Sequence, residues 1–149
     1  MNKPILAVMV GISGSGKSTF ARGLKTSLSA EVVSTDDIRL EITGDATDQT
    51  RNGEVFNIAR RRIDDLLAQG KNAVIDATSL SQKDRRLWID LGKKHGAEVL
   101  AYVVNRSIDV AKKQNLKRDR QVPDWVIDKQ KAKFQLPTTA EGFDKIVNV

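Results

Sequence analysis

The chain has 149 residues, which is enough for one domain of ordinary size and too short for two full ones. It contains no cysteine and one histidine, so disulfide bonds, thiolate metal sites, a cysteine nucleophile and a His-rich metal site are excluded. Its 25 lysine and arginine residues outnumber its 19 aspartate and glutamate residues, and the resulting net charge of +6 favours a polyanionic partner without naming one.

Residues 5–10 form the longest apolar run near the start of the chain, and a glycine-rich turn follows them. Such a run is too short to cross a membrane or to form the core of a usual signal peptide. We therefore expect one soluble, cytoplasmic domain over residues 1–149 that has no membrane partner. Its oligomeric state stays open.

Short apolar runs alternate with segments of helical periodicity, a pattern typical of an α/β fold with a mostly parallel sheet. Strands are predicted at 5–10, 31–34, 73–75, 99–104 and 145–149, the last of which is also compatible with a tail. Helices are predicted at 17–28, 54–69, 82–95, 108–118 and 124–134, and a polar loop at 44–53.

Residues 11–18 read Gly-Ile-Ser-Gly-Ser-Gly-Lys-Ser and match the pattern G-x-x-x-x-G-K-[ST] between a predicted strand and a predicted helix. Glycines let the backbone N–H groups turn inward towards phosphates, and the helix N-terminus adds a favourable dipole. Lys17 supplies a positive charge to the outer phosphates, and the hydroxyl of Ser18 can ligate Mg²⁺. The sequence therefore predicts an ATP and Mg²⁺ site built from Gly11, Ser13, Gly14, Ser15, Gly16, Lys17, Ser18 and Thr19.

Carboxylates follow the second and third predicted strands, where open α/β sheets bind their ligands. Asp36 and Asp37 follow the second strand, and we expect Asp36 to orient an acceptor hydroxyl and take its proton. Asp37 is the alternative base, and a helix beginning at Asp36 would make that residue an N-cap instead. Arg39 lies one helical turn further on and could bind a substrate phosphate or serve as an ion-paired helix residue.

Asp76 ends the third predicted strand, as a Walker B aspartate does. It could hold Mg²⁺ together with Ser18, orient Arg39, or cap the next segment. Thr78, two residues on, is a weaker candidate for a hydroxyl contact with the acceptor.

Residues 111–134 contain eight basic and three acidic residues, a net charge of +5. Within them, residues 117–121 read as a mobile turn between two helices, so we expect a basic lid at about 115–124. Arg118 and Arg120 would then close over the donor phosphates and meet the charge that develops during transfer. The arginines at 60–62 and 85–86 are expected on the surface, and Trp88 in the core.

Four elements together resemble the kinase domain of phage-type polynucleotide kinases, a family of P-loop kinases, over residues 5 to about 135. They are the phosphate loop, Asp36-Asp37-Ile38-Arg39, Asp76-Ala77-Thr78 with Arg85-Arg86, and Asn115-Leu116-Lys117-Arg118 with Val122-Pro123. The resemblance implies a three-layer fold with a five-stranded parallel sheet in the order 2-3-1-4-5, helices on both faces and a small lid. It also implies an ATP-dependent, Mg²⁺-assisted kinase acting on 5′-hydroxyl ends of DNA or RNA, as in nucleic-acid repair.

The resemblance implies a role for each residue that matches a motif position of the family. Lys17 and Ser18 would bind donor phosphates and Mg²⁺, and Asp36 would activate the 5′-hydroxyl. Arg39 would hold the acceptor's 3′-phosphate, steadied by Asp76, and Arg118 would clamp the donor. Val122 and Pro123 would pack on the terminal base.

Two departures from that family stand out. Thr35 occupies the position of a family arginine, and the lid is one residue shorter, so Arg118 and Arg120 compete for the clamp. The alternatives are a kinase of a small hydroxyl compound, such as a nucleoside or sugar acid, and a nucleotide-binding module with little turnover.

Overall fold

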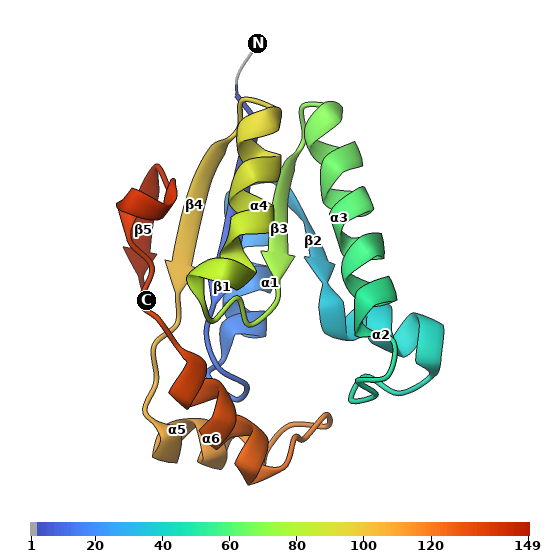
Figure 1. Ribbon diagram of the computed structural model, residues 1–149, viewed down its shortest axis with the longest axis vertical. Helices are drawn as coiled ribbons and strands as arrows, with labels where there is room; N and C mark the ends of the chain where they lie inside the picture. The colour runs from blue at the N-terminus through green and yellow to red at the C-terminus, as the bar shows by residue number, and fades with distance from the viewer. Residues whose placement is uncertain (1–2) are drawn as a thin grey trace.

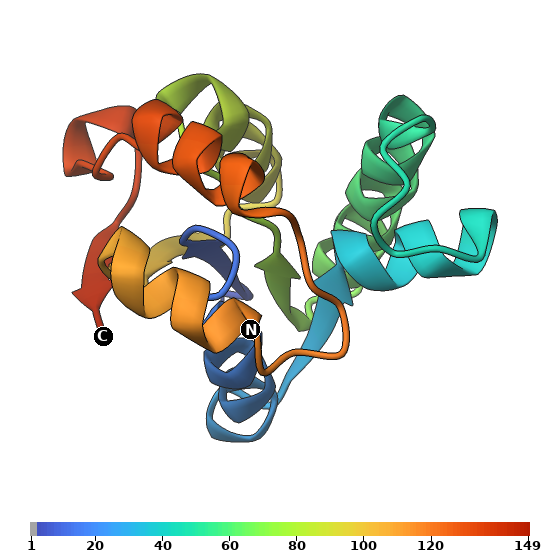
Figure 2. The ribbon, with the colours of Figure 1, turned by 90° about the horizontal axis from the view of Figure 1, so that it is seen from below.

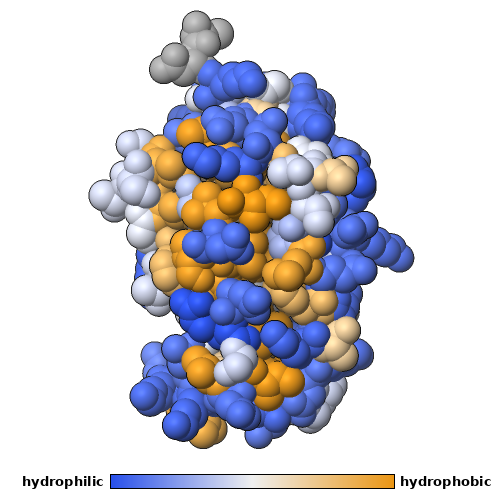
Figure 3. Space-filling view, turned by 90° about the vertical axis from the view of Figure 1, so that its left-hand side faces the viewer, coloured by the Kyte–Doolittle hydropathy of each residue, from blue (hydrophilic) through white to orange (hydrophobic). Residues whose placement is uncertain are grey.

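Five parallel strands form a single sheet in the computed structural model, which describes residues 3–149 (Figure 1). The strands are β1 (Ile5–Val10), β2 (Ala30–Ser34), β3 (Asn72–Asp76), β4 (Glu98–Val103) and β5 (Lys145–Asn148). Their order, β2-β3-β1-β4-β5, confirms the order that the family resemblance implies. The fifth predicted segment is a strand rather than a tail, because it pairs with β4 from Leu100↔Lys145 to Val103↔Asn148. Figure 3 shows this side of the molecule, where hydrophobic residues reach the surface among hydrophilic ones.

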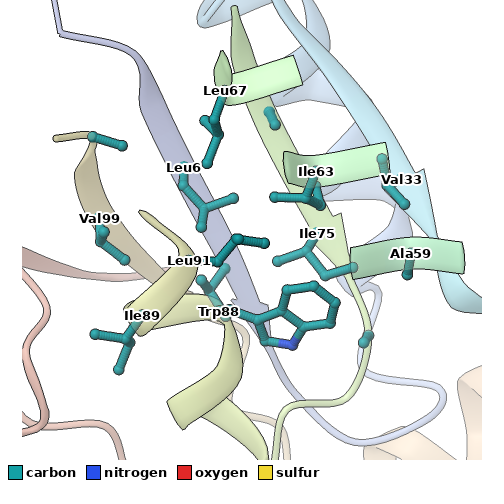
Figure 4. Close-up of a cluster of buried hydrophobic side chains, with 14 of the residues drawn as sticks. Leu6, Val33, Ala59, Ile63, Leu67, Ile75, Trp88, Ile89, Leu91 and Val99 are labelled. Carbon is teal, nitrogen blue, oxygen red and sulfur yellow. The ribbon is translucent and has the colours of Figure 1, made fainter. Parts of the chain in front are cut away.

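Helices cover both faces of the sheet, as expected of parallel strands with apolar residues on each side. Helix α1 (Lys17–Ser27) packs on one face through Ala21, against Ala7, Met9 and Val74. Helices α3 (Asn52–Ala68) and α4 (Gln82–Lys94) cover the other face. Figure 4 shows that larger core, in which the predicted core residue Trp88 is buried.

Helix α2 (Thr35–Thr43) begins directly at the end of β2, where the sequence predicted no separate helix. Its N-cap is Ser34, whose side chain accepts a hydrogen bond from the backbone N–H of Asp37. Asp36 is therefore not the cap, and its carboxylate is free for another role. Gly44 ends the helix with a φ of 79°, and the loop that follows is two residues shorter than predicted because α3 begins at Asn52.

Helices α5 (Ile108–Asn115) and α6 (Asp124–Lys133) lie at the carboxyl ends of the strands, beside the loop that follows β1 (Figure 2). The sequence predicted that the first of them extends to residue 118. It ends at Asn115 instead, because the Asn115 amide donates to the carbonyl of Val122 and accepts from its N–H, at 2.7 and 3.1 Å. Residues 116–123, here called the lid segment, connect the two helices and extend towards α2.

Arg85 is fully buried, so the prediction that it lies on the surface is wrong. Its guanidinium binds both carboxylate oxygens of Glu141, at 2.8 and 3.1 Å, and donates to the carbonyls of Ser79 and Leu80. The pair joins α4 to the short helix η1 (Thr139–Glu141) and fixes the loop that follows β3.

His95 caps the carboxyl end of α4, as its position before Gly96 predicts. Its Nε2 lies 2.6 Å from Oδ1 of Asp64, and this hydrogen bond holds the pKa of the Asp64 carboxyl below its ordinary value. Among residues 3–149, no helix is both long and apolar enough to cross a membrane.

Candidate active site at the carboxyl ends of the strands

The loop between β1 and α1 packs closely against α5. Gly14 has a φ of 80°, and a Cβ placed there would lie 2.2 Å from the carbonyl oxygen of Ala111, so no other residue fits without moving the backbone. Gly11 donates its N–H to the carbonyl of Thr78, which anchors the loop to the end of β3. The loop is therefore held from two sides, and its remaining side is open to a ligand.

Lys17 and Ser18 both meet Asp76 at the start of α1. The Ser18 hydroxyl donates to Oδ2 of Asp76 at 2.9 Å, and the Lys17 ammonium lies 3.9 Å from its Oδ1. The Arg39 guanidinium binds Asp36 and Asn52 rather than Asp76, so the expectation that Asp76 orients it is wrong. The next helix, α4, is capped by Ser81, so Asp76 does not cap it.

One cavity of about 880 Å³ brings most of the predicted site residues together. That volume falls in the range of ligand sites for nucleotide-sized molecules. The predicted residues that line this main cavity are Gly14, Ser15, Gly16, Lys17, Ser18, Thr19, Asp36, Asp76, Arg118 and Arg120. The phosphate loop, the acidic pair Asp36 and Asp37, and the two lid arginines thus line the same cavity.

Strand register places the acidic residues at the same depth. Ser34 pairs with Asp76 across β2 and β3, so the start of α2 stands beside the end of β3. Asp36 faces the main cavity with its side chain 41% exposed and accepts a 2.8 Å hydrogen bond from Arg39. Arg39 is buried and is also bound to the Asn52 side chain, at 3.0 and 3.2 Å. Its guanidinium therefore fixes the carboxylate of Asp36.

The lid segment reaches across the cavity to the acidic pair. Arg120 forms a 2.9 Å ion pair with Asp37, on the side of the cavity opposite α5. Arg118 lines the same cavity and has no carboxylate partner among residues 3–149. Arg118 and Arg120, the two candidates for the donor clamp, therefore differ in the structure. Arg120 is ion-paired with Asp37, and Arg118 is available to a ligand.

Buried Arg39 and five other predicted residues lie outside the cavity lining. Gly11 and Thr78 meet each other through their backbones. Val122 is half-buried against the cluster that contains Ile12 and Leu80, while Pro123 is exposed at the start of α6. The fifth, Ser13, donates its N–H to the side chain of Gln130.

The structure gives three amides a role that the sequence did not assign to them. Asn52 holds Arg39, Asn115 holds the lid segment, and Gln130 of α6 accepts the N–H of Ser13 at 2.7 Å. Asn52 and Gln130 are uncharged residues in helices with many charged neighbours, and no motif marks them, whereas Asn115 begins one of the elements that carry the family resemblance. Their partners are 7 to 117 residues away in the chain, so only the fold identifies them.

Replacing Gln130 by leucine leaves the Ser13 N–H without its partner, and we expect the free energy of unfolding to fall by about 1–2 kcal/mol. Since Ser13 belongs to the phosphate loop, the Kd for ATP should rise about three- to tenfold at the same time. Gln82→Leu is the matched control, because that glutamine is exposed. Calorimetric binding and urea unfolding measure both effects. Equal ATP affinity in the two variants would contradict the role of Gln130.

Ser18 at the start of α1 and Asp76 at the end of β3 fit a bound Mg²⁺. A hydroxyl and a carboxylate, from Ser18 and Asp76, are the hard oxygen ligands that this ion prefers, and both face the main cavity. Within residues 3–149, no three His, Cys, Asp or Glu side chains gather into a metal site. The remaining ligands would therefore be water and phosphate oxygens, as is usual for Mg²⁺ bound with a nucleotide.

A family model described as an AAA domain matches residues 6–137. The chain is 28% identical over 145 residues to a putative bifunctional polynucleotide kinase/RNA ligase of Autographa californica nuclear polyhedrosis virus. It is 25% identical over 149 residues to a bifunctional polynucleotide phosphatase/kinase of Schizosaccharomyces pombe. These matches cover 87% and 97% of the chain but span 20% and 33% of the length of the relatives.

Solved structures agree with this fold. A chain of the Pnkp1/Rnl/Hen1 RNA repair complex matches with a TM-score of 0.79 and 28% identity, over 97% of this chain and 47% of that one. A gluconokinase from Sinorhizobium meliloti matches with a TM-score of 0.62 and 20% identity, over 100% of this chain and 83% of that one, which shows a shared fold alone. The P-loop kinase fold and the resemblance to polynucleotide kinase domains are thereby confirmed.

Proposed function

The chain belongs to this family of AAA domains, and we propose that it is an ATP-dependent polynucleotide kinase that phosphorylates the 5′-hydroxyl end of DNA or RNA. The observation that carries the proposal is the main cavity, where a phosphate loop, a carboxylate held by a buried arginine and a basic lid face one another. The names of the viral and fission yeast relatives support the choice of acceptor.

The donor side of the cavity binds ATP. Backbone N–H groups of the phosphate loop surround the phosphates, and Lys17 neutralises charge on the outer ones. Ser18 and Asp76 would hold Mg²⁺, which supplies further positive charge to the donor's phosphate oxygens when bound. This side of the site therefore positions and polarises the γ-phosphoryl group.

The acceptor side centres on Asp36. Its carboxylate orients the acceptor hydroxyl and receives the proton as the hydroxyl oxygen forms its bond to the γ-phosphorus. The bond from that phosphorus to the oxygen of the departing ADP breaks in the same in-line displacement. Arg39, fixed by Asn52, holds Asp36 in the required orientation. In this proposal Arg39, to which the family resemblance gives the acceptor's 3′-phosphate, is a positioning residue, in keeping with the ion-paired alternative that the sequence left open.

The lid segment completes the site. Arg118 has no carboxylate partner among residues 3–149, and it supplies the cation that meets charge developing on the γ-phosphoryl oxygens. Arg120 links the lid to the acceptor side through Asp37 and so covers the reacting groups. Excluding water in this way protects the donor from hydrolysis.

A second candidate is a kinase of a small hydroxyl compound. Val122 and Pro123, which the family resemblance places on the terminal base, lie outside the main cavity. That position removes one contact specific to a nucleic acid and suits a compact acceptor. The similar fold of the gluconokinase supports this candidate.

Steady-state kinetics over a panel of acceptors decides between the two. The panel contains a 5′-hydroxyl oligonucleotide, a 3′-phosphorylated nucleoside, free nucleosides and gluconate, each with labelled ATP. The proposal predicts the highest kcat/KM for the oligonucleotide. A higher value for a nucleoside or gluconate would favour the second candidate, and ATP binding without any transfer would favour a nucleotide-binding module.

A further inference from the structure

A stripe of α1 continues the main cavity away from the phosphate loop. Ser18, Arg22 and Lys25 are spaced i, i+4 and i+7, which places them on one face of the helix, and all three line the cavity. At 1.5 Å per residue, Lys25 stands about 10 Å along the axis from Ser18. Arg22 donates a 3.4 Å hydrogen bond to the hydroxyl of Thr19, beside the phosphate loop, and Lys25 lies three residues further along the helix.

The opposite wall of this part of the cavity belongs to the acceptor side. It consists of Val32 and Ser34 of β2, followed by Asp36 at the start of α2. Helix α1 packs against β2 and against the strand beside it, so the two walls are neighbours along their length (Figure 1). The space between α1 and β2 starts at Asp36, the proposed base, and leads away from the point of phosphoryl transfer.

The charges along this space are available to an anion. Among residues 3–149, Arg22, Lys25 and the nearby Lys117 of the lid segment form no ion pair with a carboxylate. Three of the four carboxylates in the cavity lining are already paired, each with Lys17, Arg39 or Arg120. The unpaired charge on this side is thus mainly positive.

A second cavity, of about 380 Å³, is another path past β2 for an acceptor strand, and the charges that line it are mainly negative. Its lining contains the carboxylates of Glu31, Asp37, Glu41 and Asp65 but a single guanidinium, Arg62. That guanidinium is bound to Glu41 at 2.8 Å. A strand of phosphodiesters is repelled there and attracted along α1.

We propose that Arg22 and Lys25 bind the internucleotide phosphates that follow the 5′-terminal nucleoside of a single-stranded acceptor. Basic grooves that follow the backbone are the usual means of holding single strands without reading their sequence. The inference rests on the proposed function and extends it, because a free nucleoside carries no anionic group for these cations and a sugar acid carries a single carboxylate, whereas a strand offers one phosphate after another. Acceptors with at least one internucleotide phosphate are therefore the favoured class.

The test compares Arg22→Gln/Lys25→Gln with Arg60→Gln/Arg61→Gln, a control that removes the same charge from exposed positions of α3 lining neither cavity. Acceptors are a 5′-hydroxyl decanucleotide and a free nucleoside, which carries no phosphate. We expect the ratio of their kcat/KM values to fall about tenfold in the α1 variant and to stay unchanged in the control. Binding of a fluorescent decanucleotide, measured against salt, should lose about 1.4 from its slope, since each single-strand contact contributes about 0.7.

An unchanged ratio and salt slope in the α1 variant would overturn the inference, as would an equal loss with both acceptors or a raised KM for ATP. The proposed function is judged separately by the unsubstituted protein. If that protein phosphorylates the decanucleotide while the α1 variant matches it, the inference alone fails. If it binds the decanucleotide through Arg22 and Lys25 without phosphorylating it, the proposed function fails while the binding site stands.

Discussion

Asp36→Asn should lower kcat for phosphoryl transfer by about 10²- to 10⁴-fold, the usual contribution of a positioned general base. The amide keeps the shape of the side chain and can still accept from Arg39, but it cannot take the hydroxyl proton. Asp36 does not contact the phosphate loop in the structure, so the Kd for ATP should stay within about twofold. Rapid-quench kinetics with labelled ATP, together with calorimetric ATP binding, measures both quantities.

Asp37→Asn is the matched control, because it neutralises the neighbouring carboxylate in the same cavity. It weakens the ion pair to Arg120 and should cost about tenfold or less, through the lid and not through proton transfer. A larger loss in this variant than in Asp36→Asn would make Asp37 the base. That outcome would restore the alternative that the sequence left open.

Glu141→Gln and Arg85→Met should each lower the free energy of unfolding by about 3–5 kcal/mol, because each leaves a buried charge without its partner. The pair is almost fully buried, with side-chain exposures of 0% and 2%, and Arg85 also holds two carbonyls of the loop after β3. Urea unfolding measures the change. We expect these to be the largest stability losses from single charge removals in the chain.

Arg62→Met provides the comparison, since Arg62 and Glu41 form an ion pair of similar length that is about half exposed. Its removal should cost less than about 1 kcal/mol. The double variant Arg85→Met/Glu141→Leu should recover part of the loss, because it leaves no unpaired charge. Similar losses from Arg62→Met and Arg85→Met would contradict the account of the buried pair.

The sheet and the phosphate loop could be predicted because their signals are local. Apolar runs bounded by polar residues mark buried parallel strands, and residues 11–18 carry a complete motif between a strand and a helix. Placing Asp36 and Asp76 near the phosphates required only the rule that strand ends meet at one edge, and the register Ser34↔Asp76 agrees with it.

Long-range pairing could not be predicted. Arg85 looks like a surface residue in its own segment, and its partner Glu141 is 56 residues away. In the sequence Arg39 is a candidate for binding a phosphate, but in the structure its guanidinium is bound to the Asn52 side chain. A helix beginning at Asp36 was left open, and its true start was not predicted, because α2 follows β2 without a loop and Ser34 both ends the strand and caps the helix. The roles of the lid residues stay predictions.

The most direct test of the central claim is where the label goes. The protein is incubated with γ-labelled ATP and one of two decanucleotides of the same sequence, bearing either a 5′-hydroxyl or a 5′-phosphate, and the product is digested to mononucleotides. The account predicts label in the 5′-terminal nucleotide of the first strand and none in the second. Label in neither strand, or in both equally, would contradict it.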